Sequence, residues 1–172
     1  MTILAVATGS APPDAFLEDL SQLFTTGQRL AYAMLRSEDE AEDAVQEAAL
    51  KAWRARERFR PGAALRPWFL TIVANECRQR RRSHWWSVNN MSDVPRWEDT
   101  RPDERVTGAD LRAALRRISI DHRLVVVLRY YLDLPFEEIG KIVGCSPQAA
   151  KSRTHRALQQ LRLEVPRQET DD

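Results

Sequence analysis

The chain has 172 residues, of which 43% are hydrophobic and 30% charged, and its formal net charge is +1 at pH 7. This composition is typical of a soluble globular protein with one domain or two small ones, and it excludes a largely disordered chain. No apolar run is long enough to span a bilayer, and the first residues lack the basic start and long apolar stretch of a signal peptide, so we expect a cytoplasmic protein.

Opposite charges are segregated along the chain. Residues 14–47 have nine acidic side chains against two arginines, residues 51–82 have ten basic side chains against two glutamates, and residues 141–167 are basic again. Two basic stretches suit a nucleic-acid partner. The small total charge nevertheless indicates weak binding to duplex DNA by the protein alone, because the phosphate contribution to affinity grows with the number of phosphates neutralised.

In chain order, residues 1–13 are expected to form a disordered tail, and two helices follow. Apolar residues from Phe16 to Leu35 recur at helical spacing, with a break expected at Gly27. Ser37 and Glu40 have the spacing of a capping box, which predicts the start of a second helix with small residues on its inner face.

The outward face of this second helix combines acidic, amide, apolar and basic groups. It consists of Asp43, Gln46, Glu47, Leu50 and Arg54. Such a stripe suits a protein partner and hardly suits DNA. A solvated face with one exposed leucine is the plain alternative.

A basic segment completes the first domain. Residues 58–67 contain two prolines and a glycine and predict a loop, after which an apolar helix begins and ends in arginines. An arginine-rich helix end beside a loop with Phe59 suits single-stranded DNA, because guanidinium groups neutralise phosphates and a loop pocket can hold an unstacked base. The plain alternative is a basic helix end that pairs with its own dipole, but four arginines exceed what a helix end needs.

Residues 85–107 are expected to form a flexible linker between two helical domains at 14–84 and 108–165, and residues 166–172 are expected to form a second disordered tail. The linker stretch has prolines, serines and asparagines without sustained periodicity. Its tryptophans are expected to pack on a neighbouring domain rather than to stack on bases; they are Trp85, Trp86 and Trp97.

The C-terminal domain is predicted to contain a helix-turn-helix. Phe136 opens a short amphipathic helix, Gly144 can end it in a left-handed conformation, and Ser146 can cap a second helix that starts with Pro147. The outward residues of the second helix are polar and basic: Gln148, Lys151, Ser152, His155 and Gln159, with Arg153 and Arg156 on the flanks. This face suits a DNA groove, and the plain alternative is an ordinary helical hairpin with a solvated basic face.

The chain resembles the extracytoplasmic-function sigma factors of bacterial RNA polymerase, which belong to the primary-sigma (sigma-70) family. Three motifs carry the resemblance, in the family's order: AEDAVQEAALKAW, RPWFLTIVANECRQRRR and LPFEEIGKIVGCSPQAAKSRTHRALQQLR. The chain departs from many relatives at Gln79, where they have Asp, and at Ala149 and Ala150, where they have a Thr-Val pair. These departures concern the promoter sequence rather than the family.

The resemblance implies an all-α fold and three sets of contact residues. The set implied for the clamp coiled coil of core polymerase is the acidic stripe named above, Asp43 to Arg54. The set implied for the minus-ten element is Arg58, Phe59, Arg60, Asn75, Arg78, Arg80, Arg81 and Arg82. The set implied for the minus-thirty-five element is Gln148, Lys151, Ser152, Arg153, His155 and Arg156. The family also implies contact with the polymerase flap, and an anti-sigma factor as a regulatory partner.

The residues do not indicate an enzyme. The three histidines lack carboxylate or cysteine partners at metal-ligand spacing, Cys77 and Cys145 stand alone, and no Gly-rich phosphate loop or nucleophile motif is present. We therefore expect neither a metal nor another cofactor. One rival function remains, a classical helix-turn-helix regulator that binds an operator on its own, but it leaves the arginine-rich loop of the first domain without a role.

Overall fold

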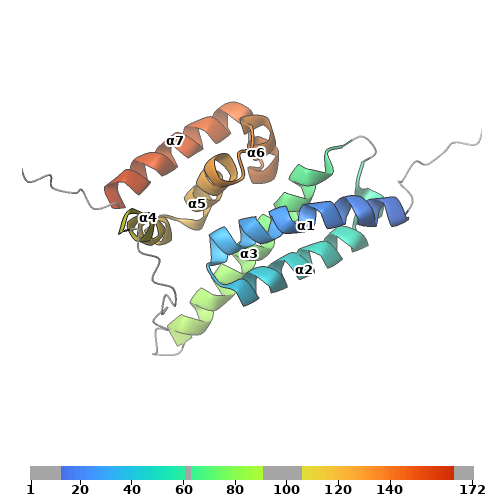
Figure 1. Cartoon of the computed structure of the whole chain (residues 1–172), viewed down its shortest axis with the longest axis horizontal. Helices are drawn as coiled ribbons and strands as arrows, with labels where there is room; N and C mark the ends of the chain where they lie inside the picture. Colours follow the sequence, from blue (N-terminus) through green and yellow to red (C-terminus); the bar gives the residue numbers. More distant parts are fainter. Residues whose placement is uncertain (1–12, 61–62, 91–105, 165–172) are drawn as a thin grey trace, which may run out of the picture.

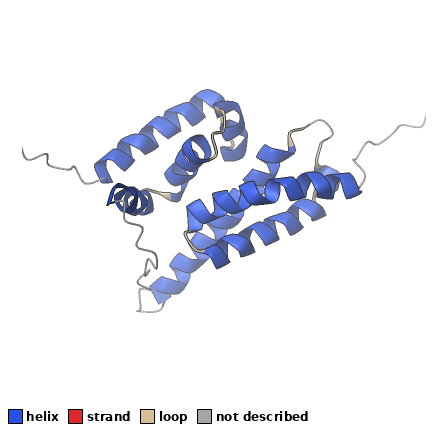
Figure 2. Cartoon of the chain, viewed as in Figure 1, coloured by secondary structure: helices blue, strands red, loops and turns tan. Residues whose placement is uncertain are grey.

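The computed structural model describes residues 13–60, 63–90 and 106–164, and in these ranges it contains helices and no strand (Figures 1 and 2). The elements are α1 (Pro13–Leu35), α2 (Glu38–Arg54), η1 (Arg56–Arg58), α3 (Leu65–Asn90), α4 (Val106–Arg117), α5 (Ile120–Val126), η2 (Val127–Tyr131), α6 (Phe136–Val143) and α7 (Pro147–Glu164). The all-α prediction is confirmed. The described residues include no helix with the length and apolar character needed to cross a membrane.

The N-terminal half is a bundle of α1, α2 and α3. The hydroxyl of Ser37 accepts a hydrogen bond from the backbone N–H of Glu40, as the capping signal predicts. Small buried residues on α2 let the three helices approach closely; they are Ala41, Ala44, Val45, Ala48 and Ala52. The break predicted at Gly27 is wrong, since α1 runs through it without interruption. Gly27 is buried, and a Cβ there would lie 3.0 Å from the ring of Phe69, so the glycine serves close packing instead.

The C-terminal half contains the predicted helix-turn-helix, formed by α6 and α7. Gly144 has a left-handed backbone (φ 72°), and the Cys145 N–H donates to the carbonyl of Gly140 at 2.8 Å. A Cβ on Gly140 would lie 2.6 Å from the carbonyl oxygen of Cys145, so the turn closes tightly only because this residue has no side chain. The hydroxyl of Ser146 accepts from the N–H of Ala149 and so caps α7.

Helix α5 continues into a π-helical turn, η2. The N–H of Leu132 donates to the carbonyl of Val127 at 3.0 Å, which is an i→i+5 bond with one more residue in the turn than an α-helix has. Val127 and Leu128 are buried in this turn, whereas Tyr130 and Tyr131 are 61% and 49% exposed.

The two halves pack against each other. Helix α3 contacts α6, and α1 contacts α5 and η2, so that buried residues of both halves belong to one apolar core (Figure 1). We call this packing the closed arrangement. Helix α3 begins at Leu65, inside the loop predicted to reach residue 67, and ends at Asn90, past the predicted domain boundary at 84. The predicted tails, Trp97 and most of the predicted linker lie outside the described residues, as do the side chains of Trp85 and Trp86.

Candidate nucleic-acid interface

The stripe predicted on α2 lies along one surface of the molecule. Asp43, Gln46, Leu50 and Arg54 are exposed and Glu47 is half-buried, while the opposite face of α2 is buried. Leu50 keeps 49% of its surface exposed. Behind the stripe, the Nζ of Lys51 lies 2.6 Å from a carboxylate oxygen of Glu76 on α3, which fixes α2 against α3. The five predicted residues therefore form one continuous surface with an apolar centre.

The loop predicted for the minus-ten element follows α2 directly. Arg58 and Arg60 are exposed. Phe59 is half-buried, and its ring lies 5.1 Å from that of Trp68 and 6.2 Å from that of Phe16, measured between centroids. Trp53 completes this aromatic cluster through its contact with Phe16. Phe59 is therefore packed against other rings and is not a free stacking side chain.

The arginines of α3 do not share one environment. Arg78 donates from Nε to Asp121 of α5 at 2.8 Å and from Nη1 to the amide oxygen of Asn75 at 3.1 Å. Arg80 turns toward α2, with Nη1 3.7 Å from a carboxylate oxygen of Asp43 and a buried Nε that has no partner among the described residues. Arg81 and Arg82 are exposed. The structure thus brings Asn75 and Arg78 together and separates Arg80 from them.

The predicted recognition surface on α7 is accessible. Gln148, Lys151, Ser152, His155 and Arg156 are exposed, and Arg153 is half-buried. The Nε2 atom of His155 lies 3.2 Å from the side-chain nitrogen of Gln159, one turn further on. The inner face of α7 is buried through Ala150, Thr154, Ala157 and Leu161, so the whole polar face is held outward.

A buried arginine, Arg123, is not among the site residues predicted from the sequence. Arg123 on α5 is 1% exposed and donates to three backbone carbonyls, those of Met34 at 2.8 Å, Leu115 at 2.8 Å and Arg116 at 3.1 Å. Burial, assisted by nearby arginines, lowers its pKa to about 10, so it remains charged at neutral pH. A signal was present: Arg123 stands at helical spacing from Val127, next to an unbroken apolar run.

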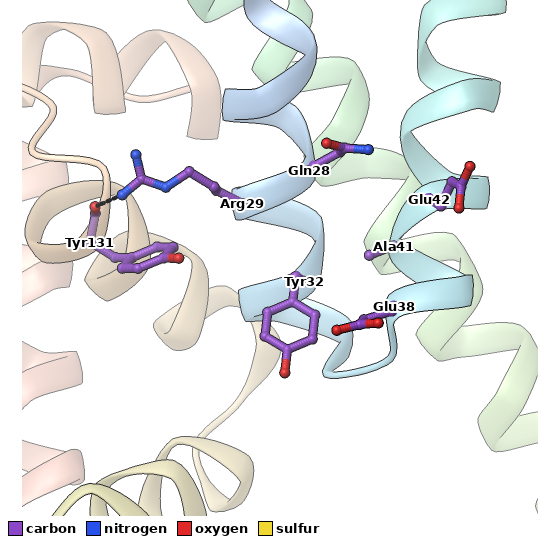
Figure 3. A pocket seen from close by; sticks show the side chains of 7 residues that line it. All are labelled: Gln28, Arg29, Tyr32, Glu38, Ala41, Glu42 and Tyr131. Atoms are coloured by element: carbon purple, nitrogen blue, oxygen red, sulfur yellow. Dashed lines mark hydrogen bonds between the residues drawn. The ribbon is translucent and has the colours of Figure 1, made fainter. Parts of the chain in front are cut away.

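Two cavities open where α1 meets the C-terminal half. The smaller is about 320 Å³ and is lined by Gln28, Arg29, Tyr32, Glu38, Ala41, Glu42 and Tyr131 (Figure 3). In it, Arg29 reaches across from α1 and donates to the carbonyl of Tyr131 at 3.3 Å (Figure 3). The larger is about 470 Å³, shares both tyrosines and extends over Leu111 and Leu115 of α4. The smaller cavity has charged side chains on its wall, Arg29, Glu38 and Glu42, whereas the larger, which we call the interdomain groove, is lined mostly by apolar side chains.

Neither thiol joins a cluster of metal ligands. Over the described ranges, no three His, Cys, Asp or Glu side chains lie close enough to hold a metal ion. Cys77 is buried, and burial raises the pKa of its thiol to about 12, so it is protonated and unreactive at neutral pH. Cys145 is half-buried in the turn before α7.

Comparison with protein families matches both halves of the chain. Residues 28–87 match the model of sigma-70 region 2, and residues 109–161 match that of sigma-70 region 4. Among curated proteins, the chain is 34% identical to the RNA polymerase sigma factor CarQ of Myxococcus xanthus, over 87% of this chain and 88% of CarQ. It is 32% identical to the ECF RNA polymerase sigma factor SigL of Mycobacterium tuberculosis, over 78% of this chain and 80% of SigL.

Solved structures agree with the sequence relatives. The sigma factor RpoE of Bartonella quintana, solved in complex with the anti-sigma factor NepR, matches with a TM-score of 0.73 and 26% identity, over 92% of this chain and 99% of RpoE. CnrH, solved with the cytosolic domain of CnrY, shares the fold with a TM-score of 0.65 and 21% identity, over 93% of each chain. With both regions matched in order and most of its length aligned, the chain belongs to the extracytoplasmic-function group of the sigma-70 family.

Proposed function

We propose that this protein directs core RNA polymerase to promoters by binding the enzyme through α2 and by reading the minus-ten and minus-thirty-five elements through the α3 region and α7. The observation that carries the proposal is the coexistence of two exposed surfaces of different chemistry in one chain. The α2 stripe has carboxylates around an exposed leucine, and the α7 face is basic and polar behind a glycine turn. The first suits a protein and the second suits a DNA groove.

In this function, α7 lies in the major groove of the minus-thirty-five element. Lys151, Ser152 and His155 face base edges, and Arg153 and Arg156 lie near phosphates. The N-terminal cap at Ser146 supports this placement, because it starts α7 at Pro147 and so puts Gln148, Lys151 and Ser152 in the first two turns, the end of a recognition helix that contacts base edges.

The minus-ten element is bound as a melted strand. Residues 58–65 capture an unstacked base, while Asn75, Arg78 and the arginines that follow guide the phosphates. The cluster of Phe16, Trp53, Phe59 and Trp68 supports this role, since a loop that holds a base needs a rigid wall. Binding energy from the captured base opens the duplex, so the step requires no hydrolysis and the protein is not an enzyme.

Polymerase supplies the affinity that the protein lacks alone. With a net charge of +1, the chain binds DNA weakly by itself. Once α2 and the C-terminal half are held on the clamp and flap of the polymerase, the two DNA-binding surfaces are linked. Each binds weakly by itself, but binding of one raises the effective concentration of the other at the promoter. Because polymerase and chromosome share the bacterial cytoplasm, cytoplasmic localisation is part of the proposal.

The experiment that tests the function is transcription from a promoter library with purified core polymerase, with and without the protein. A gel-shift with the protein alone is run in parallel. We expect defined start sites only when protein and polymerase are both present. Tight, sequence-specific binding by the protein alone, without polymerase-dependent initiation, would instead support the classical regulator, which the match to region 2 does not favour.

An anti-sigma factor is the regulatory partner that we propose in the resting cell. The relative of Bartonella quintana was solved with such a factor. On this chain, four large hydrophobic side chains around the groove are exposed: Tyr32, Leu111, Tyr130 and Tyr131. An exposed apolar patch of this kind is typical of a protein–protein interface. Affinity purification from unstressed cells is expected to recover a stoichiometric inhibitor, and its absence would contradict this part of the proposal.

A further inference from the structure

Charged side chains of opposite sign meet where one edge of α2 lies against one edge of α3. Asp43, Glu47 and Lys51 are spaced four residues apart and so share an edge of α2, and Glu76 and Arg80 share an edge of α3 in the same way. The Nζ of Lys51 lies 2.6 Å from a carboxylate oxygen of Glu76 and 3.8 Å from one of Glu47. The Nη1 of Arg80 lies 3.7 Å from the Oδ2 of Asp43. Two carboxylates of the α2 stripe are therefore flanked by cations.

Arg80 is held differently from the two arginines that follow it. Its Nε is buried, although 32% of the side chain is exposed. The stem of the side chain therefore lies against the protein, and only the end of the guanidinium reaches the surface. Arg81 and Arg82 are exposed, and neither forms an ion pair with a residue that the structure describes.

The position of Arg80 is unfavourable for a promoter phosphate. Arginine binds a phosphate most strongly when two of its N–H groups donate in parallel from one side of the guanidinium plane. Burial of Nε removes one such pair of donors, and Nη1 is turned toward Asp43. Neither constraint applies to Arg81 or Arg82, which are better suited to the melted strand.

The same position suits a role beside Asp43. The side chain of Asp43 is 66% exposed, so a partner can still reach its carboxylate while Arg80 approaches Oδ2 from α3. A side chain that is already held in place loses less conformational freedom when the partner binds, and the affinity is higher for that reason. Lys51 restrains Glu47 in a similar way, because it is itself fixed to Glu76, which is only 7% exposed.

We propose that Arg80 serves the polymerase-binding surface rather than the minus-ten element, as a positioning residue that holds Asp43 in the orientation that core polymerase engages. This inference rests on the proposed function and refines it. Of the arginines that follow Arg78, Arg81 and Arg82 remain for the phosphates, and Arg80 is removed from that group. The surface that determines polymerase affinity thus extends from α2 onto α3.

The test compares substitutions of neighbouring arginines in the full chain. Arg80→Ala removes the cation beside Asp43. Arg81→Ala is the matched control, because it makes the same change of net charge at the next position of the same helix. Arg80→Lys keeps a cation at the original position. Circular dichroism verifies that each variant is folded under the conditions of the binding measurements.

Two affinities are measured for each variant. Fluorescence titration gives the affinity for core polymerase, and anisotropy at low ionic strength gives the affinity of the free protein for a labelled single-stranded minus-ten oligonucleotide. We expect Arg80→Ala to weaken polymerase binding about three- to fivefold, as loss of a partly exposed ion pair does, and oligonucleotide binding by less than about 1.5-fold. For Arg81→Ala the larger loss is expected with the oligonucleotide. If Arg80→Ala weakens only oligonucleotide binding, the inference is overturned.

A double-mutant cycle separates positioning from direct contact with polymerase. If Arg80 acts through Asp43, then Arg80→Ala added to Asp43→Ala should weaken polymerase binding by less than about 1.5-fold further. Losses that multiply would mean that Arg80 contacts polymerase itself, which contradicts a positioning role. Arg80→Lys is expected to recover most of the affinity, since an ammonium group also pairs with a carboxylate, and a lysine variant as weak as the alanine variant would contradict the ion pair.

The same measurements distinguish failure of the inference from failure of the proposed function. If Asp43→Ala and Leu50→Ala both leave polymerase binding unchanged, α2 is not the polymerase-binding surface, and that part of the proposed function fails together with the inference. If Asp43→Ala weakens binding whereas Arg80→Ala does not, the proposed function stands and the role given to Arg80 is wrong.

Discussion

The two basic surfaces of this sigma factor differ in how far their charges are already neutralised. On α3, Arg66, Arg78 and Arg80 each lie against a carboxylate of another helix. On α7, Lys151, Arg153 and Arg156 have no ion pair with any residue in the described part of the chain. Equal basicity in sequence therefore does not mean equal exposure. On α7, Lys151 and Arg156 are exposed and unpaired within the described residues, whereas on α3 Arg78 and Arg80 are half-buried and paired, and only Arg81 and Arg82 are exposed without a carboxylate partner in that part of the chain.

The largest difference between the halves is expected in their thiols. Burial raises the pKa of Cys77 from its ordinary 9.0 to about 12, so its thiolate fraction at pH 8 is about a thousandfold lower in the folded chain than in the unfolded one. Ellman's reagent at pH 8 should therefore modify Cys145 first, and Cys77 only after denaturant is added. Rapid modification of both thiols in the folded protein would show that the N-terminal core is looser than described. Since the folded thiol keeps its proton up to about pH 12, this group favours folding below pH 9 and loses that contribution as the pH rises toward 12.

The contact between the halves should depend strongly on Arg123. Arg123→Ala leaves three backbone carbonyls, one buried and two partly buried, without their donor, so we expect the free energy of unfolding to fall by about 3 kcal/mol. Urea denaturation followed by circular dichroism measures the change. Arg117→Ala is the matched control, because the side chain of Arg117 is 62% exposed and should contribute less than about 0.5 kcal/mol. Similar losses for both variants would refute the role of Arg123 as the donor to the last carbonyls of α1 and α4.

The proposed contact of α7 with duplex DNA can be tested with Lys151→Ala. We expect this variant to lower promoter-dependent transcription and binding of the free protein to a minus-thirty-five duplex by about tenfold, because a contact to a base edge is lost. Binding to core polymerase should be unchanged. Lys141→Ala removes another exposed lysine, on α6, and serves as the control. Loss of polymerase binding in the Lys151 variant, with the fold preserved, would show that the surfaces are wrongly assigned.

A smaller effect is expected at the polymerase stripe. Leu50→Ala removes the apolar centre of this stripe and should weaken binding to core polymerase by about fivefold, while duplex binding by α7 is unaffected. Leu17→Ala is a close control, since Leu17 on α1 is 45% exposed and Leu50 is 49% exposed. Fluorescence titration of labelled protein with core polymerase measures both. Equal losses for the two leucines would indicate that α2 has no privileged role in binding.

Local signals in the sequence predicted local structure well. The caps at Ser37 and Ser146 and the left-handed Gly144 are confirmed, because each depends on backbone groups only a few residues away. Gly27 was misread as a break because its real constraint, the ring of Phe69, is distant in the sequence. For the same reason the sequence alone did not indicate that Asp121 and Glu138 pair with α3, or which carbonyls Arg123 binds.

In the candidate site, too, features set by nearby residues were predictable and features set by distant residues were not. Exposure of the α2 stripe and of the α7 face was predictable, since each follows from the periodicity of a single helix. The separation of Arg80 from Arg78 was not, because it depends on which helix packs against each side of α3. The roles assigned to these residues toward polymerase and promoter remain predictions for the experiments above.

The π-helical turn at Val127–Tyr131 has a consequence for the evolution and engineering of this domain. It accommodates one residue more than a regular turn, and the chain leaves it with Tyr130 and Tyr131 on the wall of the interdomain groove. Deleting a single residue here would restore an ordinary helix and rotate everything beyond the deletion by about 100° about the helix axis. A one-codon change would therefore redirect this surface while leaving the sequences of α3 and α7 untouched.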